Sequence, residues 1–284
     1  MEARSVLQHL VLIPQSGLCN RLRAIASARR LCQRFAARCS IVWDWGDFWD
    51  LFTKVPDVEI IQNLPQPDKV ARHQPRHVDP TRTVDITVRT LQLHSGQIFW
   101  GSHESQIQLH QLVEYVPRLN SRLQGIVDDF AKRNLQNTVG FHLRRTDQAQ
   151  SILHSPDVLF FRKANEIISE GKKIFLATDN LKTIKKFRRK FGDMIIVYPK
   201  RTELEKRWPR PQFDQMAVED DLIDLFLLVK SEYIIGSHFS SFSCMARALN
   251  GSPKSAILKT ESSENLNQHK NFVGIILNRL HRKR

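Results

Sequence analysis

The segment at residues 138–147, which reads TVGFHLRRTD, changes from alternating apolar residues to polar and charged ones. Its first part predicts a buried strand, and the end of that strand carries two adjacent arginines, Arg144 and Arg145. A guanidinium group presents its N–H donors in a fixed fork that matches phosphate oxygens. Asp147 is placed to hold one fork and leave the other for a diphosphate. The alternative is an interior Arg–Asp ion pair that only stabilises the strand end.

Two later predicted strands, at residues 173–178 and 233–236, also end in polar side chains. These are Thr178, Asp179 and Asn180 after the first strand, and His238, Ser240 and Ser241 after the second. The carboxyl ends of parallel strands lie at one edge of a sheet, so we expect these groups to face a common ligand. Arginines and serine hydroxyls suit a diphosphate, and an aspartate suits the N–H edge of guanine. The set predicts a purine nucleoside diphosphate whose charge is neutralised by arginine, with no cofactor; the lack of a D-x-D pair at a strand end here argues against a metal.

The composition predicts a basic globular protein with a polyanionic partner. Lys and Arg number 43 against 29 Asp and Glu, a formal charge of +14, and 41% of the residues are hydrophobic. Nucleic acid, an anionic membrane and phosphorylated substrates all fit that charge. We expect no nucleic acid, because the basic residues are dispersed and no recognition motif is present.

The cysteine pattern and the N-terminal segment bear on the expected location. None of the four cysteines forms a C-x-x-C pair and no histidine has zinc-finger spacing, so we expect buried free thiols and a reducing compartment. The apolar run at residues 10–13 is too short for a signal peptide or a membrane span. A cytoplasmic protein is expected, with peripheral contact at the inner face of an anionic membrane as a further expectation.

Strands alternate with helices along the chain, and the pattern restarts near residue 138, which predicts an α/β fold with two domains. Strands are expected at residues 6–13, 40–43, 58–61, 83–88, 97–100, 138–143, 173–178, 194–197 and 233–236. Helices are expected from residue 18 and from residue 157, and at residues 119–134, 181–191, 218–230 and 243–249. The helix from residue 157 is expected to use Ser155 as its cap, and the acids early in the helix at 218–230 suit the helix dipole.

The expected domains are residues 1–135 and residues 136–262, with parallel sheets facing a central cleft. The remaining residues, 263–284, are apolar with a basic end. They are expected to form a helix that packs back on the first domain, with an interfacial membrane helix as the alternative.

Four segments together resemble the GDP-fucose-dependent fucosyltransferase superfamily, which includes α1,6-, nodulation and protein O-fucosyltransferases. They read SGLCNRLRAIASA, HLRRTD, FLATDN and GSHFSSFSCMARAL, in the order the family has them. The resemblance covers residues 10–28 and 138–249, HxRRTD is its most specific part, and small bacterial members are the most similar. It implies a GT-B fold of two Rossmann-like domains. It also implies inverting, metal-independent transfer of fucose or a related sugar from a GDP-sugar to a glycan or a lipid-linked saccharide.

The resemblance also implies roles for individual residues. Arg144 would bind the β-phosphate and stabilise it as the leaving group. Arg145 and Asp147 would hold the loop. The residues implied to contact the donor are Gly17, Asn20 and Arg21 in the first domain, and His142, Asp179, Asn180, His238, Phe239, Ser240 and Ser241 in the second. Of the first-domain residues, Asn20 is placed with the catalytic groups.

The sequence departs from the family where a base is needed. A glutamate follows the RRTD loop in α1,6-fucosyltransferases, whereas the same region here reads QAQSILHS and has no carboxylate. Inversion requires a group that accepts the proton of the acceptor hydroxyl. His154, Asp44 and Asp47 are the candidates. Without a base, the chain would be a non-catalytic nucleotide-sugar-binding protein, and a nucleic-acid-binding protein is a more distant alternative.

Overall fold

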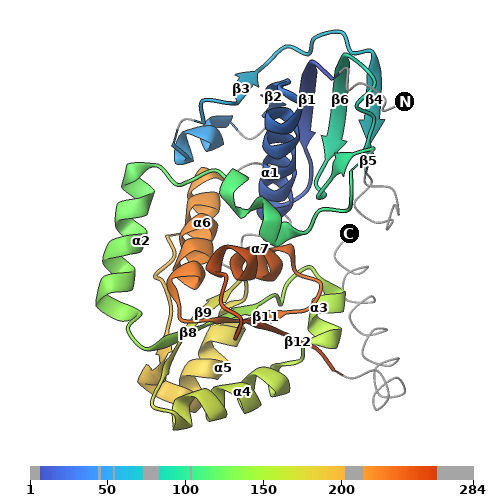
Figure 1. The fold of residues 1–284 in the computed structure, drawn as a ribbon. Coiled ribbons are helices and arrows are strands. Elements are labelled where there is room, and N and C mark those ends of the chain that lie inside the picture. The colour runs from blue at the N-terminus through green and yellow to red at the C-terminus, as the bar shows by residue number, and fades with distance from the viewer. Residues whose placement is uncertain are drawn as a thin grey trace, which may run out of the picture. The chain divides into compact units, whose positions relative to one another are not determined.

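The computed structural model describes residues 7–43, 46–53, 55–72, 83–102, 104–201 and 214–260, without the side chains of residues 46–48. The chain divides into two compact units, residues 1–125 and 126–284, and the division falls within helix α2 (Ser121–Asn134). Figure 1 labels most of the helices and strands of the two units, each of which is described separately. The predicted helix at 263–284 lies outside the described residues.

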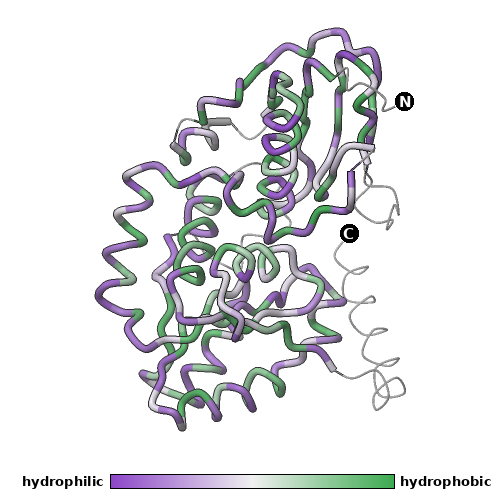
Figure 2. The backbone as a smooth tube through the Cα atoms, in the orientation of Figure 1, coloured by the Kyte–Doolittle hydropathy of each residue, from purple (hydrophilic) through white to green (hydrophobic). Residues whose placement is uncertain are grey.

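The first unit contains a five-stranded sheet whose strand pairs are all parallel, in the order β3-β2-β1-β6-β4. The strands are β1 (His9–Pro14), β2 (Arg38–Val42), β3 (Glu59–Ile61), β4 (Lys69–Arg72) and β6 (Thr90–Ser95). Helix α1 (Leu18–Phe35) packs its apolar residues on one face, and Figure 2 shows its turns alternating between hydrophobic and hydrophilic. The described residues of this unit also form two short strands, β5 (Thr83–Val84) and β7 (Trp100–Gly101), and two 3-10 helices, η1 (Gly46–Leu51) and η2 (Leu109–Tyr115).

Strand β6 was absent from the sequence prediction, although it pairs with β1 along its whole length. The residues of β6 alternate, with Leu91 and Leu93 fully buried in the core and Gln92 and His94 on the opposite face. Gln92 Nε2 and His94 Nε2 lie 2.9 Å apart and so satisfy each other. The strands predicted on either side of β6 are wrong in extent, since β5 and β7 have two residues each.

The second unit contains a five-stranded parallel sheet in the order β10-β9-β8-β11-β12. Its strands are β8 (Thr138–Leu143), β9 (Lys173–Thr178), β10 (Ile195–Ile196), β11 (Ile234–Ser237) and β12 (Ala256–Leu258). Counted from β8, this is the 3-2-1-4-5 order of a Rossmann fold. The order reverses between β8 and β11, and ligands of such sheets bind at the carboxyl ends of the strands at that point.

Helices cover both faces of the second sheet. The helices are α3 (Ala149–His154), α4 (Asp157–Ser169), α5 (Leu181–Phe191), α6 (Gln215–Lys230) and α7 (Ser241–Asn250), with the 3-10 turn η3 (Gly192–Met194) after α5. Phe141 of β8 contacts Phe160 of α4 and Phe187 of α5, which places these two helices on one face. Figure 1 shows α6 and α7 on the other face. All of β8 is buried, as a central strand between two helical layers requires.

Gly236 of β11 allows α7 to lie directly on the sheet. A Cβ atom at this position would lie 2.6 Å from Ser243 Cβ and 2.8 Å from Ser243 Oγ, both well inside van der Waals contact. The close packing of the first turn of α7 on β11 therefore requires a residue without a side chain at position 236.

The predicted α/β class with two Rossmann-like domains is confirmed, since each unit has its own parallel sheet and core. Among the described residues, none of the helices is both long enough and apolar enough to cross a membrane.

We expect Gly236→Ala to destabilise the protein by about 1–3 kcal/mol, because the added methyl group forces α7 off β11. Thermal unfolding would show a melting temperature lower by about 2–4 °C for each kcal/mol. Gly125→Ala in α2 is the control, since nothing lies within 4 Å of its Cβ position; it should be neutral or stabilising. Equal melting temperatures for the two variants would contradict the close approach.

Candidate functional site

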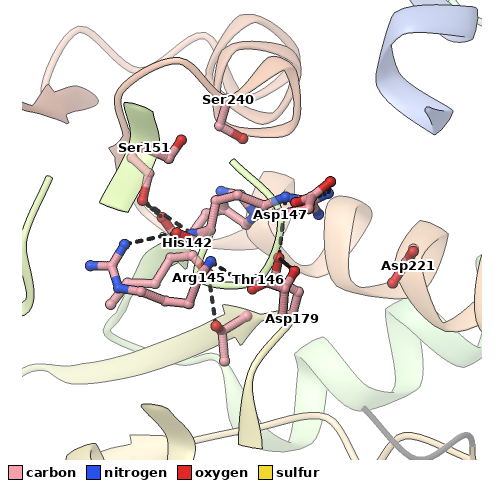
Figure 3. Close-up of polar contacts among 12 residues, drawn as sticks. His142, Arg145, Thr146, Asp147, Ser151, Asp179, Asp221 and Ser240 are labelled. Atoms are coloured by element: carbon pink, nitrogen blue, oxygen red, sulfur yellow. Dashed lines mark hydrogen bonds and ion pairs between the residues drawn. The ribbon is translucent and has the colours of Figure 1, made fainter. Parts of the chain in front are cut away.

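The polar residues predicted from three strand ends lie at one edge of the second sheet. Residues after β8, β9 and β11 come together there because the three strands are neighbours and parallel. Figure 3 shows Arg145 and Thr146 hydrogen-bonded to Asp179 at this edge, with Asp147 in the same group. The edge is also where the strand order reverses, so the site occupies the usual binding position of the fold.

Arg144 is held between two carboxylates and remains partly open to solvent. Its Nη2 lies 2.6 Å from Asp147 Oδ1, and its Nε lies 3.1 Å from Asp179 Oδ2. Burial acts to lower the pKa of Arg144, but Asp179 and Asp147 outweigh it and raise that pKa. The side chain is 32% exposed, so this cation is oriented in advance and still accessible to an anion.

Arg145 has the opposite environment, although it is the next residue. Its Nε donates to Asp157 Oδ1 at 2.7 Å, its Nη2 donates to the Ser155 carbonyl at 2.7 Å, and its side chain is 8% exposed. The guanidinium also lies 5.5 Å from the centre of the Phe160 ring. These contacts occupy the fork, so Arg145 acts as an anchor of the loop.

Asp179 connects the loop after β8 to the end of β9. Its Oδ1 accepts from the backbone N–H of Arg145 at 2.7 Å, and its Oδ2 accepts from Thr146 Oγ1 at 2.6 Å. Asn180, the next residue, caps α5 by accepting from the Thr183 N–H at 3.0 Å. Both residues were predicted to contact the nucleoside. In this structure Asp179 fixes the geometry around Arg144, whereas Asn180 caps α5.

His142 is buried on the α7 side of β8. Its Nδ1 lies 2.7 Å from Ser243 Oγ, and its ring stacks on Phe242 at 4.6 Å with an angle of 19° between the planes. Burial, together with the charges of Arg144 and Lys200, holds the pKa of His142 well below 6.5. The imidazole is therefore neutral at pH 7 and adds no positive charge beside the arginines.

The segment between β11 and α7 supplies an anion-binding helix terminus. Ser240 is the N-cap, and its side chain accepts from the Ser243 N–H at 3.4 Å, while Ser241 is the first helical residue. Free N–H groups at a helix start favour phosphate. Phe239 has a positive φ of 52° and is 55% exposed, a strained conformation of the kind that clusters at functional sites.

His154 lies beside the same segment. Its ring centre is 5.8 Å from that of His238 and 5.7 Å from that of Phe239. Burial, followed by the charges of His154 and Lys259, lowers the pKa of His238.

The predicted helix cap at Ser155 is wrong. Ser155 Oγ instead accepts from the His238 N–H at 2.8 Å and donates to the Leu258 carbonyl at 2.5 Å. Pro156 occupies the N-cap position of α4 without a side-chain hydrogen bond. Ser155 therefore ties the end of α3 to β11 and β12, which fixes the position of His154.

The predicted first-unit residues lie at the carboxyl end of β1. Gly17 precedes α1 as its N-cap, and Asn20 is half-buried in the first turn. Arg21 is buried, donates from Nε to the Ser16 carbonyl at 2.8 Å, and lies 5.3 Å from the Trp43 ring centre. Of the remaining base candidates, Asp44 and the side chain of Asp47 lie outside the described residues.

Sequence reasoning missed a second acidic group near Arg144. Asp221 on α6 contributes to the raised pKa of Arg144, and Figure 3 shows it apart from the Asp147 and Asp179 group. Lys200 Nζ lies 2.5 Å from Asp224 Oδ2 and 3.9 Å from Asp221 Oδ1. The signal was the run of acids early in α6, which was attributed to the helix dipole although Glu219, Asp220 and Asp224 are buried.

Among the described residues, no cluster of three or more His, Cys, Asp or Glu side chains has the arrangement of a metal site.

The lowered pKa of His142 makes stability depend on pH. Below about pH 6.5 the imidazole of His142 takes up a proton in the unfolded state but not in the folded state. The free energy of unfolding is therefore unaffected by this residue above pH 6.5 and decreases as the pH falls below it. We expect up to about 1.4 kcal/mol of lost stability per pH unit from this residue. Urea denaturation between pH 7 and about pH 5 should show a shallower pH dependence for His142→Gln than for the parent. Parallel curves for the two proteins would contradict a neutral buried His142.

No protein-family model and no curated protein matches the sequence. Solved structures do match it. NodZ α1,6-fucosyltransferase soaked with GDP-fucose is 18% identical with a TM-score of 0.57, over 86% of this chain and 92% of that one. A variant of FUT1 from Arabidopsis thaliana in complex with GDP is 14% identical with a TM-score of 0.61, over 92% of this chain and 72% of that one.

The apo form of POFUT1 is 11% identical with a TM-score of 0.56, over 89% of this chain and 97% of that one. NodZ from Bradyrhizobium, in a selenomethionine form, matches 91% of this chain at 17% identity. At these identities the likeness establishes the fold. The resemblance that the motifs predicted is therefore confirmed at that level: the chain has the fold of these fucosyltransferases.

Proposed function

We propose that the protein is an inverting, metal-independent glycosyltransferase that transfers fucose or a related sugar from a GDP-sugar to a glycan or a lipid-linked saccharide. The observation that carries the proposal is Arg144: a partly exposed guanidinium, oriented by two carboxylates, at the reversal point of a Rossmann sheet. The structural neighbours support the donor, since NodZ was soaked with GDP-fucose and POFUT1 was crystallised in complex with GDP.

Arg144 would stabilise the diphosphate as the bond to the sugar breaks. Negative charge on the leaving oxygen grows during that step, and a fixed cation stabilises it without reorganisation. Asp147 and Asp179 keep the fork oriented, which lowers the entropy cost of aligning it with the phosphate. The start of α7 at Ser240 and Ser241 would bind further phosphate oxygens through backbone N–H groups.

His154 is the base that we propose for the acceptor hydroxyl. Its ring lies beside the exposed Phe239 and next to the segment that begins α7. Residues 148–154 contain no carboxylate that would serve instead. The same absence supports the second candidate function, a protein that binds a nucleotide sugar and does not transfer it.

The four cysteines are free thiols, with Cys19, Cys32 and Cys39 buried. Free thiols are typical of reducing compartments, which supports the cytoplasmic location proposed here.

We expect Arg144→Ala to weaken GDP binding at least about 30-fold, because a charged partner of the diphosphate is removed. Arg144→Lys should give an intermediate affinity, since it keeps the charge but loses the fork. Isothermal titration with GDP, with and without EDTA, measures both effects, and EDTA should change nothing. Arg118→Ala, an exposed arginine of the first unit, is the control and should bind as the parent does.

A thermal-shift panel tests the donor separately. GDP-fucose should raise the melting temperature of the parent, whereas UDP-glucose should not. Equal stabilisation by the two nucleotide sugars would exclude the proposed donor.

We expect His154→Gln to slow transfer by about 100-fold or more and leave GDP affinity unchanged, as loss of a general base does. Release of GDP from GDP-fucose in the presence of acceptor glycans measures the rate. His110→Gln, which changes an exposed histidine of the first unit, is the matched control. If the parent binds GDP-fucose and releases no GDP with any acceptor, the non-catalytic function holds instead.

A further inference from the structure

Helix α5 presents an outer face made entirely of cations. Every exposed residue of this helix is a lysine or an arginine: Lys182, Lys185, Lys186, Arg188, Arg189 and Lys190. The helix contains no acid, and the next acid along the chain is Asp193 in η3. We call these six residues the basic face.

The orientation of the basic face is fixed by packing. Ile184 and Phe187 of α5 are buried in the core of the second unit, against β8 and α4. Figure 2 shows the resulting alternation of hydrophilic and hydrophobic residues along the helix. Because the apolar side is committed to the sheet, the cations have to face outward.

Helix α4 adds an apolar border to the basic face. Phe161 is half-buried, with its ring 4.8 Å from that of Phe187, and Lys190 Nζ lies 5.7 Å from the Phe161 ring centre. One turn earlier, Val158 is 61% exposed, the largest exposure among the large hydrophobic residues described. Arg162 is exposed beside it.

The charge of the basic face is largely uncompensated. Within the part of the chain that the structure describes, Lys186 is the one member in an ion pair, at 2.8 Å from Asp157 Oδ2. The other oxygen of Asp157 holds Arg145 of the candidate site. One carboxylate therefore balances two cations, and five further cations of the face have no acidic partner there.

We propose that the basic face binds the surface of an anionic phospholipid bilayer. Clusters of about four to eight Lys and Arg on an amphipathic helix are typical of anionic-lipid binding. An apolar border such as Val158 and Phe161 suits the boundary between headgroups and acyl chains. Nucleic acid fits less well, because the exposed positions of α5 offer none of the Ser, Thr, Asn or Gln side chains that share phosphate contacts with arginine and lysine. The inference is independent of the proposed transferase activity.

Co-sedimentation of the full chain with vesicles tests the proposal. The parent should bind vesicles of mixed phosphatidylcholine and phosphatidylglycerol and not vesicles of phosphatidylcholine alone. Each cation near an anionic surface contributes about fivefold in affinity, so the triple variant K182Q/K185Q/R189Q should lose about 100-fold in partitioning. Lys186 stays unchanged in this variant because it shares Asp157 with Arg145.

The triple variant R89Q/R118Q/K132Q removes the same charge from exposed positions elsewhere and is the matched control. It should keep the vesicle binding of the parent to within about fivefold. Val158→Ser should weaken binding at raised salt, where the electrostatic contribution is screened and the apolar one remains. Both triple variants should melt as the parent does, since all six changes are at exposed positions.

Three results would overturn the proposal. The first is parent protein that stays in solution with anionic vesicles at low salt. The second is equal loss of binding in the two triple variants, which would show an effect of net charge alone. The third is tighter binding of a single-stranded RNA oligonucleotide than of anionic vesicles, lost in the K182Q/K185Q/R189Q variant, which would identify a nucleic-acid surface.

Discussion

The candidate site depends on the ion pairs that three carboxylates form with two neighbouring arginines, Arg144 and Arg145. Asp157 draws Arg145 into the protein, where its fork is fully occupied. Asp147 and Asp179 hold Arg144 from the side and leave part of it exposed. Two residues that are adjacent in sequence thus become one anchor and one accessible cation. Asp157 thus removes Arg145 from the competition for Asp147 and Asp179, while Asp179 also holds the loop after β8 through the Arg145 N–H and Thr146.

The same edge is kept from becoming too positive by a neutral histidine. His142 lies on the strand that leads to Arg144, and burial with the nearby charges lowers its pKa. A protonated imidazole there would be buried beside cations, which is costly. The contact with Ser243 and the stack on Phe242 hold the neutral ring. Gly236 makes this packing possible, because any side chain there would push the start of α7 away from the sheet.

The second half of the chain was more predictable from sequence than the first. Strands such as β8 and β9 are apolar throughout or nearly so, and they end in compact polar motifs, so pattern alone located them and their shared edge. The prediction missed strand β6 because Gln92 and His94 interrupt its apolar pattern. In the structure these two side chains hydrogen-bond each other on a half-covered face, a pairing that sequence does not reveal. The motif identified the two arginines as site residues. It could not show that their environments differ, because that difference depends on Asp157, which lies 12 residues after Arg145. Asp221 was missed for a related reason: its position near Arg144 follows from the packing of α6 on the sheet.

Asp157 links a buried charge, Arg145, to an exposed one, Lys186. One of its oxygens accepts from Arg145 and the other pairs with Lys186 on the outside of α5. Burial opposes the charged form of this carboxylate, while the two cations lower its pKa and keep it ionised. An exposed ion pair contributes little by itself, but this one helps to set the charge of the acid that anchors the loop. The outer helix and the strand-end loop are therefore connected through a single side chain, since Asp157 holds Arg145 and Arg145 Nη1 donates to the Arg144 carbonyl at 2.9 Å.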